Sequence, residues 1–394
     1  MNLQPPQAWL DSWIAKNEAD LIAVRRHLHA HPETGRAEYQ TTALIMDRLS
    51  AAGLSPKPLP AGTGLWCDVG DGPRTIALRA DIDALTLPDA KPVPYRSTVP
   101  GACHACGHDA HTAILLGVAL ALAAAPARLP GRVRCIFQPA EEVIPGGAHD
   151  VMAAGGLEDV QRIFAVHCDP HLETGRLGLR VGSITAACDL VEVRASGPGG
   201  HTARPHLTVD LVYALGRIIT EVPGLLARVA DPRAAMSLVW GSVEAGLAPN
   251  AIPQSGTLRG TVRMLDRAVW DQAESLVRRL VAQVAAPTGA RVVVHYHRGV
   301  PPVVNDERSV ELLREGVVAA LGPEAVGITG QSLGGEDFGW YLNHIPGGLA
   351  RLGVHSGDGP MRDLHRGTFD IDERALAIGV RTLVHTAFAA LRAC

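Results

Sequence analysis

The sequence predicts an α/β protein in which a mostly parallel sheet is sandwiched by helices and a smaller domain is inserted. Three apolar runs, residues 75–85, 132–142 and 162–170, carry acidic or histidine side chains toward their ends, and helical patterns separate them. Strands this apolar are buried on both faces, as in parallel sheets covered by helices. Residues 182–298 change to a strand and helix order that is typical of a ferredoxin-like α+β unit.

The length of the chain favours two domains. It has 394 residues, and single hydrophobic cores stop growing at about 250–300 residues. Its composition, 47% hydrophobic and 19% charged, is that of a globular rather than a disordered chain. We therefore expect a larger domain formed by residues 1–181 plus 299–394, and an inserted domain formed by residues 182–298.

The larger domain is expected to begin with two helices, over residues 7–29 and 41–52. Apolar residues recur near helical spacing in the first helix, which Pro32 ends, and Gly53 closes the second. The three apolar strands follow, with a helix over residues 109–126 between the first two. From about residue 300 the chain should return to this domain with two helices and a strand.

The inserted domain is expected to have the order β-α-β-β-α-β. Residues 189–196 alternate as a half-exposed strand does, and the second helix begins after Asp266, a good N-cap residue. The other expected elements are a helix over 208–230, strands over 236–245 and 257–265, and a last strand over 291–297.

Several classes of protein are disfavoured by charge and composition. The chain has 36 basic and 40 acidic side chains and no basic stripe, so we expect no nucleic-acid partner. No apolar run reaches the roughly 20 residues that span a bilayer, and no signal peptide is expected, so no membrane partner is predicted. Seven irregularly spaced cysteines argue against a disulfide framework and favour a cytoplasmic location.

Four segments place metal-ligating side chains where strands end or helices begin. Asp81 and Asp83 follow the first strand, Glu141 and Glu142 the second, and His167 ends the third. The segment CHACGHD, residues 103–109, directly precedes a helix. Ligands bind beyond the carboxyl ends of strands in open α/β sheets, so these donors should share one rim. Such donors from separate segments suit a catalytic metal site.

The CHAC segment leaves other interpretations open. A CxxC pair can be a redox motif or half of a structural zinc site, but no second CxxC is present. Cys103, Asp109 and His111 could support the site or cap the helix. The three histidines 27, 29 and 31 look metal-like, but capping and packing beside Pro32 is the favoured interpretation.

The glycine loop GPGGHTARPH, residues 197–206, lies between a strand and a helix of the inserted domain. Glycine loops before helices can hold phosphate, but no GK[ST] follows this one. His201 and Arg204 could instead reach into an active site as polarising groups.

The motifs resemble those of the zinc-dependent aminoacylase, carboxypeptidase and amidohydrolase family, in its branch of hippurate hydrolases and auxin-conjugate amidohydrolases. The matching segments run from residue 25 to residue 373, and they are RRHLHAHPE, LRADIDAL, HACGHDAHTA, FQPAEE, GGHTARPH, NAIP, GGEDFGWYL and LHRGTFDIDE. The resemblance implies a zinc-exopeptidase-like catalytic domain with two divalent metal ions, which could be zinc, manganese, nickel or cobalt. It also implies an inserted lid domain that forms a homodimer or homotetramer.

The resemblance also assigns roles to residues. Metal ligands would be Cys106, His108, Glu142, His167 and His365. Glu141 would be the general base that activates water, and Asp83 would support the site. Asp81 replaces a ligand histidine of related enzymes, so its own ligation is in doubt. His201 would polarise the scissile carbonyl, with Asn250 and Arg204 contacting the substrate.

These observations predict a metal-dependent enzyme that hydrolyses the amide bond of small N-acyl amino acids. A dipeptidase or carboxypeptidase with the same chemistry is the first alternative. A thiol redox protein based on CHAC is the second, and a binding protein that has lost catalysis is the third. The presence of Glu141 beside a ligand argues against the last of these.

Overall fold

The computed structural model describes residues 7–125 and 129–393, so Cys394 lies outside the described part of the chain. The chain divides into two compact units. Unit 1 comprises residues 1–182, 304–330 and 340–394, and unit 2 comprises residues 183–303 and 331–339. Residues 331–339 thus belong to unit 2, whereas the expected domain boundaries placed them in the larger domain.

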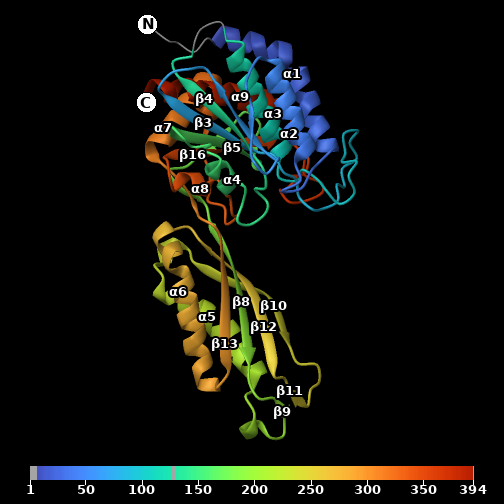
Figure 1. Ribbon diagram of the computed structural model, residues 1–394, viewed down its shortest axis with the longest axis vertical. Helices are drawn as coiled ribbons and strands as arrows, with labels where there is room; N and C mark the ends of the chain where they lie inside the picture. The colour runs from blue at the N-terminus through green and yellow to red at the C-terminus, as the bar shows by residue number, and fades with distance from the viewer. Residues whose placement is uncertain (1–6, 126–128, 394) are drawn as a thin grey trace. The chain divides into compact units, whose positions relative to one another are not determined.

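Unit 1 is built on an eight-stranded sheet with the order β1-β2-β4-β3-β5-β16-β6-β15 (Figure 1). Its four central strands run parallel, because β3 pairs parallel with β4 and β5, and β16 pairs parallel with β5. The strands are β1 (Lys57–Pro58), β2 (Leu65–Val69), β3 (Thr75–Asp81), β4 (Arg132–Gln138), β5 (Val160–Glu173), β6 (Leu177–Leu179), β15 (Val326–Ile328) and β16 (Gly347–His355).

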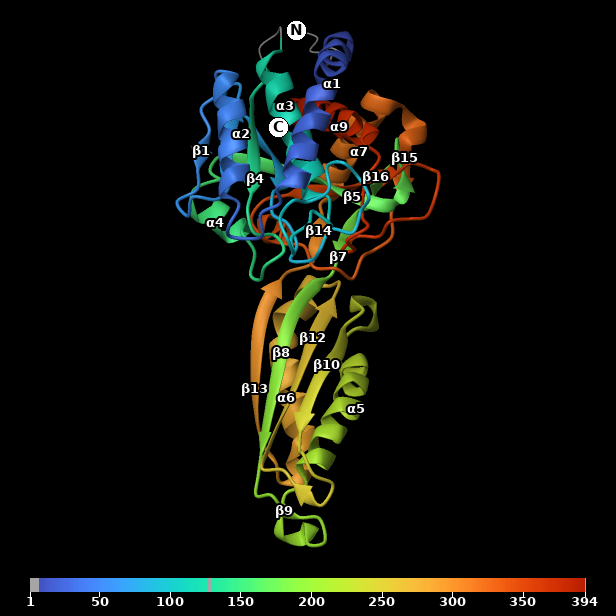
Figure 2. The same cartoon turned by 90° about the vertical axis from the view of Figure 1, so that its right-hand side faces the viewer.

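One face of this sheet packs on the main hydrophobic core. Ile76, Leu78 and Ala80 of β3 point into that core, and their neighbours Arg79 and Asp81 therefore point to the opposite face. The helices α1, α3 and α9 contribute most of the helical side of the core (Figures 1 and 2). The helices of unit 1 are α1 (Gln7–Ala30), α2 (Tyr39–Ala51), α3 (His108–Ala123), α4 (Ala148–Ala153), α7 (Glu307–Leu321), α8 (Gly339–Leu342, beginning at the boundary) and α9 (Arg374–Ala393).

The points at which two strands end matter for the site. The first ends at Asp81, so Asp83 lies in the following turn. The second ends at Gln138, because Pro139 has no N–H to donate and Ala140 has a left-handed backbone with φ 56°. Glu141 and Glu142 therefore lie in a tight turn at the carboxyl end of the sheet.

Unit 2 has the predicted β-α-β-β-α-β order, with β8 (Ala187–Ser196), α5 (Leu211–Val229), β10 (Ser237–Ala245), β12 (Ser255–Met264), α6 (Arg267–Ala285) and β13 (Arg291–Val300). Its antiparallel sheet has the order β10-β12-β8-β13, and α5 and α6 lie on one face of it (Figure 2). As predicted, Asp266 caps α6 by accepting a hydrogen bond from the Val269 backbone N–H. The α/β fold class predicted from the sequence is confirmed.

The sequence analysis missed several short elements. The strand β2 pairs antiparallel with β4 at one side of the large sheet. The other short strands are β7 (Gly182–Thr185), β9 (Gly200–His201), β11 (Ala251–Ile252) and β14 (Val303–Asn305). A two-residue strand is too short to show alternation, so periodicity could not reveal β9 or β11.

Among the described residues, one helix, α9, has the length and apolar composition that could cross a membrane, with 20 residues. However, 83% of its apolar window is buried inside the protein, as expected of a core helix.

Candidate metal centre

Five side chains from distant parts of unit 1 meet at the carboxyl ends of the central strands. Cys106 Sγ lies 3.5 Å from His167 Nε2, and His365 Nε2 lies 3.5 Å from Glu142 Oε1. His108 Nε2 lies 3.9 Å from the same glutamate oxygen. One trio, Cys106, His108 and His167, has all its ligand atoms within 4.8 Å of one another, and so does the trio Cys106, Glu142 and His365. The structure thus brings together all five predicted ligands.

Hydrogen bonds to backbone carbonyls fix which nitrogen two of the histidines present. His108 Nδ1 donates to the Asp83 carbonyl at 2.9 Å, and His167 Nδ1 donates to the Cys168 carbonyl at 2.8 Å. In the neutral ring the other nitrogen, Nε2, then carries a lone pair. Both Nε2 atoms point into the cluster, which is the arrangement that a metal-ligating histidine needs.

Asp81 and His111 form a supporting pair. His111 Nδ1 donates to Asp81 Oδ1 at 2.6 Å, and His111 Nε2 accepts the Cys168 backbone N–H at 2.9 Å. Arg79 binds the second oxygen of Asp81 at 2.6 Å. Burial alone would raise the pKa of Asp81, but the positive charges of His108 and Arg79 hold it well below its usual value. Both oxygens of this aspartate are therefore already engaged.

The turn that carries Glu141 and Glu142 is held by two buried carboxylates. Asp83 Oδ1 and Oδ2 accept the backbone N–H groups of Glu141 and Glu142, both at 3.0 Å. Glu38 Oε1 accepts the N–H of the preceding residue, Ala140, at 2.7 Å. Three successive amides are thus bound from behind by carboxylates, which fixes the direction of the two glutamate side chains.

Glu38 was missed by the sequence analysis. It is fully buried, and desolvation raises its pKa to about 7. It lies at the start of α2, where an acidic residue is ordinarily read as an exposed helix-terminal charge. No pattern in the sequence distinguishes a buried glutamate at this position from a solvated one.

The chemistry of the donor set fits a divalent cation. His108 Nε2 and Glu142 Oε1 are buried and have no hydrogen-bond partner. Burial would lower the pKa of His108, but the surrounding negative charge of Asp81, Asp83 and Glu142 outweighs it and raises the pKa to about 10. The cluster therefore attracts positive charge to Nε2. Thiolate, imidazole and carboxylate together suit zinc, and they also admit manganese, nickel or cobalt.

Asp109 does not cap α3, which corrects one possibility left open above. The N-cap residue is Gly107, without a side-chain cap, and Asp109 instead binds Arg25 Nε at 2.7 Å and His29 Nδ1 at 2.7 Å. All three side chains are fully buried. His31, in contrast, does cap, because its Nδ1 donates to the His27 carbonyl at the end of α1. This buried network joins α1 to the start of α3, beside the loop that carries Cys106.

Cys103 of the CHAC motif is not a plausible redox nucleophile in this setting. It is fully buried, and desolvation raises its pKa to about 11. Redox-active cysteines need a lowered pKa and access to solvent. The six described cysteines form no disulfide with one another.

The three predicted substrate-contacting residues lie together in unit 2. His201 is in β9, which pairs with β11 next to Asn250, and the Arg204 backbone N–H donates to the His201 carbonyl at 2.9 Å. His201 Nδ1 accepts the Ala203 backbone N–H at 3.0 Å, so the proton of the neutral ring is on Nε2. This exposed N–H is a suitable donor to a carbonyl oxygen.

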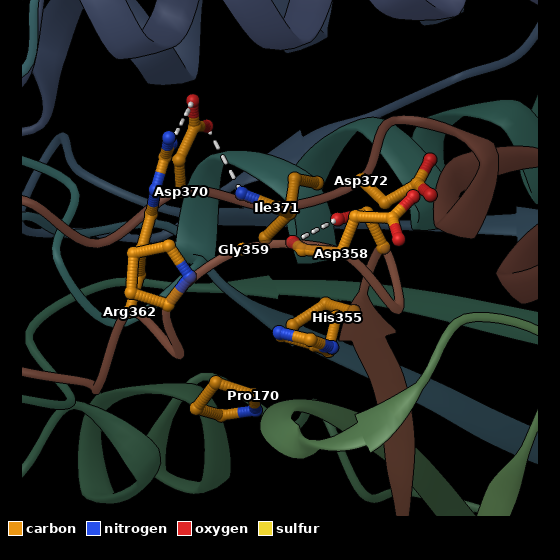
Figure 3. Close-up of a pocket in the computed structure, with 11 residues that line it drawn as sticks. Pro170, His355, Asp358, Gly359, Arg362, Asp370, Ile371 and Asp372 are labelled. Carbon is orange, nitrogen blue, oxygen red and sulfur yellow. Dashed lines mark hydrogen bonds and ion pairs between the residues drawn. The ribbon is translucent and has the colours of Figure 1, made fainter.

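A separate pocket of about 170 Å³ lies between the end of β16 and the loop that leads to His365 (Figure 3). Three of its charged groups are held in ion pairs. Arg362 contacts Asp370 at 3.5 Å, and Asp372 binds Arg374, which lies outside the pocket. These pairs leave little uncompensated charge for a ligand, so the pocket is not a second candidate site.

The fold and the cluster define a metal-dependent hydrolase with an active-site rim at the carboxyl ends of parallel strands. The model of Peptidase family M20/M25/M40 matches residues 77–389. The chain therefore belongs to this family, and the resemblance found in its motifs is confirmed.

Individual relatives show how similar other members are. The N-acetyl-L-cysteine deacetylase of Bacillus subtilis is 37% identical over 91% of this chain and 85% of its own length. A Rhodococcus jostii protein named "Putative glutamate--cysteine ligase 2-3" is 49% identical over 95% of this chain, which spans only 47% of that protein. A solved Bacillus subtilis structure, described as a dinuclear metal binding peptidase from the M20 family, has a TM-score of 0.85 and 32% identity, covering 96% of this chain and 99% of that one.

Proposed function

We propose that this protein is a metal-dependent amidohydrolase that cleaves the amide bond of N-acyl amino acids. The observation that carries the proposal is that His108 Nε2 and Glu142 Oε1 are buried without a hydrogen-bond partner, within a cluster that also contains Cys106, His167 and His365. The similarity to a deacetylase of an N-acyl amino acid supports this class of substrate.

Two divalent cations would be held by these five residues. Two of the ligand trios share only Cys106, so each trio could hold one ion with the thiolate between them. When bound, such cations supply Lewis acidity that polarises a carbonyl group and makes water nucleophilic near neutral pH. Asp81 supports the site rather than binding an ion, because His111 and Arg79 engage its oxygens.

Glu141 is the general base in this proposal. Its Oε2 lies 4.0 Å from His108 Nε2, at the edge of the ligand cluster, and its backbone is fixed by Asp83. It takes a proton from the attacking water onto a carboxylate oxygen and returns that proton to the leaving amine. His201 of unit 2, with its proton on Nε2, is proposed to stabilise the oxyanion, and Asn250 and Arg204 to contact substrate. Losing one such oxyanion donor typically costs about 10²–10³ in rate.

We also propose that unit 2 forms the contact of a homodimer, and that the protein works in a reducing compartment such as the cytoplasm. The edge strand β10 of unit 2, which exposes Val239 and Val243, supports dimerisation. The absence of a disulfide among the six described cysteines supports a reducing compartment.

The test is a substrate panel on protein that has been stripped with a chelator and reloaded separately with zinc, manganese, nickel and cobalt. We expect acetyl and benzoyl amino acids to be hydrolysed, and activity to vanish on chelation. Faster cleavage of dipeptides than of any acyl amino acid would favour the dipeptidase alternative. Activity that survives chelation but is lost on thiol alkylation would instead favour the redox alternative.

A further inference from the structure

Among the described residues of unit 1, one buried arginine has no hydrogen-bond or ion-pair partner. Four arginines are buried among the described residues, Arg25, Arg79, Arg134 and Arg351. The first binds Asp109 and Asp370, the second binds Asp81 and Gln138, and the third binds Asp68. The guanidinium of Arg351, in contrast, makes no hydrogen bond or ion pair with any described residue.

Arg351 lies beside the ligand cluster. It is paired in register with His167, across the parallel ladder between β16 and β5. Register partners in a parallel pair point to the same face of the sheet. Ala350 and Leu352 point into the hydrophobic core, so Arg351 points to the opposite face, as do Asp81 and His167.

Arg351 is largely removed from water, because the residue is only 9% exposed. A buried guanidinium without a counter-charge is costly, and such groups persist when an anion completes them.

We propose that Arg351 binds the carboxylate of the substrate. A guanidinium presents two parallel N–H groups that match a carboxylate, and an N-acyl amino acid has one carboxylate close to its scissile amide. The inference rests on the proposed function, and it makes the free carboxylate of the substrate a requirement for efficient cleavage.

The test compares two substrates that differ only in charge, N-acetyl-L-methionine and N-acetyl-L-methioninamide. In Arg351→Met, the ratio of kcat/KM for the acid to kcat/KM for the amide should fall by about 100-fold, because one partner of a buried charge pair is removed. The amide should be cleaved at nearly the wild-type rate. Arg351→Lys should restore part of the preference for the acid, because it keeps the charge but loses the paired N–H groups.

Thermal unfolding without ligand separates this role from a structural one. Arg351→Met should leave Tm unchanged or higher, since it removes an unpaired buried charge. The matched control Arg134→Met should lower Tm by several degrees, because it leaves the partner Asp68 without its ion pair. N-acetyl-L-methionine at millimolar concentration should raise Tm of the wild type but not of Arg351→Met.

Three results would overturn the inference. The first is a ratio of kcat/KM for the acid to kcat/KM for the amide that is the same in Arg351→Met as in the wild type. The second is a decrease of Tm in Arg351→Met as large as that in Arg134→Met. The third is that N-acetyl-L-methionine raises the Tm of the wild type and of Arg351→Met equally. If the wild type cleaves no acyl amino acid, the proposed function fails. The inference would then stand or fall on the thermal shift alone.

Discussion

At the scale of single residues, the backbone around Glu141 is held by two buried carboxylates. Asp83 accepts its N–H, Glu38 accepts the N–H of the residue before it, and the carboxylate lies at the edge of the ligand cluster. A base must be held in this way, because a misplaced carboxylate transfers protons slowly.

Substituting Glu141 should separate catalysis from metal binding. Glu141→Ala is expected to keep two metal ions per chain and to lose at least the 10²–10⁴-fold that general base catalysis contributes. Glu142→Ala is the matched control, and it should lose metal because it removes a ligand. Metal content by mass spectrometry and kcat check both variants. Wild-type turnover in Glu141→Ala would contradict the assignment of the base.

Glu38 should act through the turn that it holds. Glu38→Ala leaves the buried N–H of Ala140 without an acceptor, which should cost about 1–3 kcal/mol of unfolding free energy. We expect kcat to fall while metal content is kept. Glu38→Gln retains an oxygen acceptor and should recover most of kcat. Equal activity of the alanine variant and the wild type would show that the turn does not need this carboxylate.

At the scale of elements, a buried aspartate joins three elements of unit 2. Asp189 of β8 accepts hydrogen bonds from Trp270 Nε1 of α6 at 3.0 Å, Tyr296 Oη of β13 at 2.6 Å and the Gly299 backbone N–H at 2.8 Å. The elements are therefore locked by one carboxylate at their common centre. The strand register alone would not fix the helix.

This centre predicts that unit 2 loses stability at high pH. Burial and the charge of Asp189 raise the pKa of Tyr296 well above its ordinary value of 10. The contribution of Tyr296 to the stability of unit 2 is complete below pH 10, where the tyrosine is neutral in the unfolded chain as well. It is lost as pH rises further, because the unfolded chain then releases a proton that the folded one keeps.

Urea unfolding of the wild type between pH 8 and pH 11 measures this effect. Tyr296→Phe should show a smaller decrease of stability above pH 10, although it is less stable at pH 8. The same decrease in both proteins would place the alkaline sensitivity elsewhere.

The elements show what the sequence could and could not predict. Buried strands and the segments that follow them were predictable, because apolar runs and their polar ends are local patterns. The rule that parallel strands end at one edge placed Glu142, His167 and the CHACGHD segment on one rim, whereas the resemblance alone supplied His365 and the assignment of the five ligands. Arg351 was not predictable, because its neighbour His167 lies on another strand and only the register brings the two together. The Arg25–Asp109–His29 network likewise depends on the packing of α1 against α3.

At the scale of the whole molecule, the open question is how many copies work together. The antiparallel sheet of unit 2 has β10 at one edge, and the exposed fractions of Val239 and Val243 on it are 63% and 57%. Apolar side chains on an unpaired edge strand are a common seam between identical subunits.

Light scattering tests this seam. The wild type should have twice the mass of one subunit or a higher multiple. Placing a lysine at both positions, Val239→Lys with Val243→Lys, should shift the mass toward that of a single subunit. Leu247→Lys is a matched exposed control in the same unit and should leave the mass unchanged. A wild type of single-subunit mass would refute dimerisation.

The ligands are also distributed unevenly along the chain, and this affects how the protein is made. Four of them lie between residues 106 and 167, but His365 is encoded after the whole of β8 to β13. Ribosomes release a chain from its N-terminus onward. A nascent polypeptide therefore has an incomplete chelating pocket throughout synthesis of the insertion, and the set of five ligands is complete only once the segment that carries His365 has been translated.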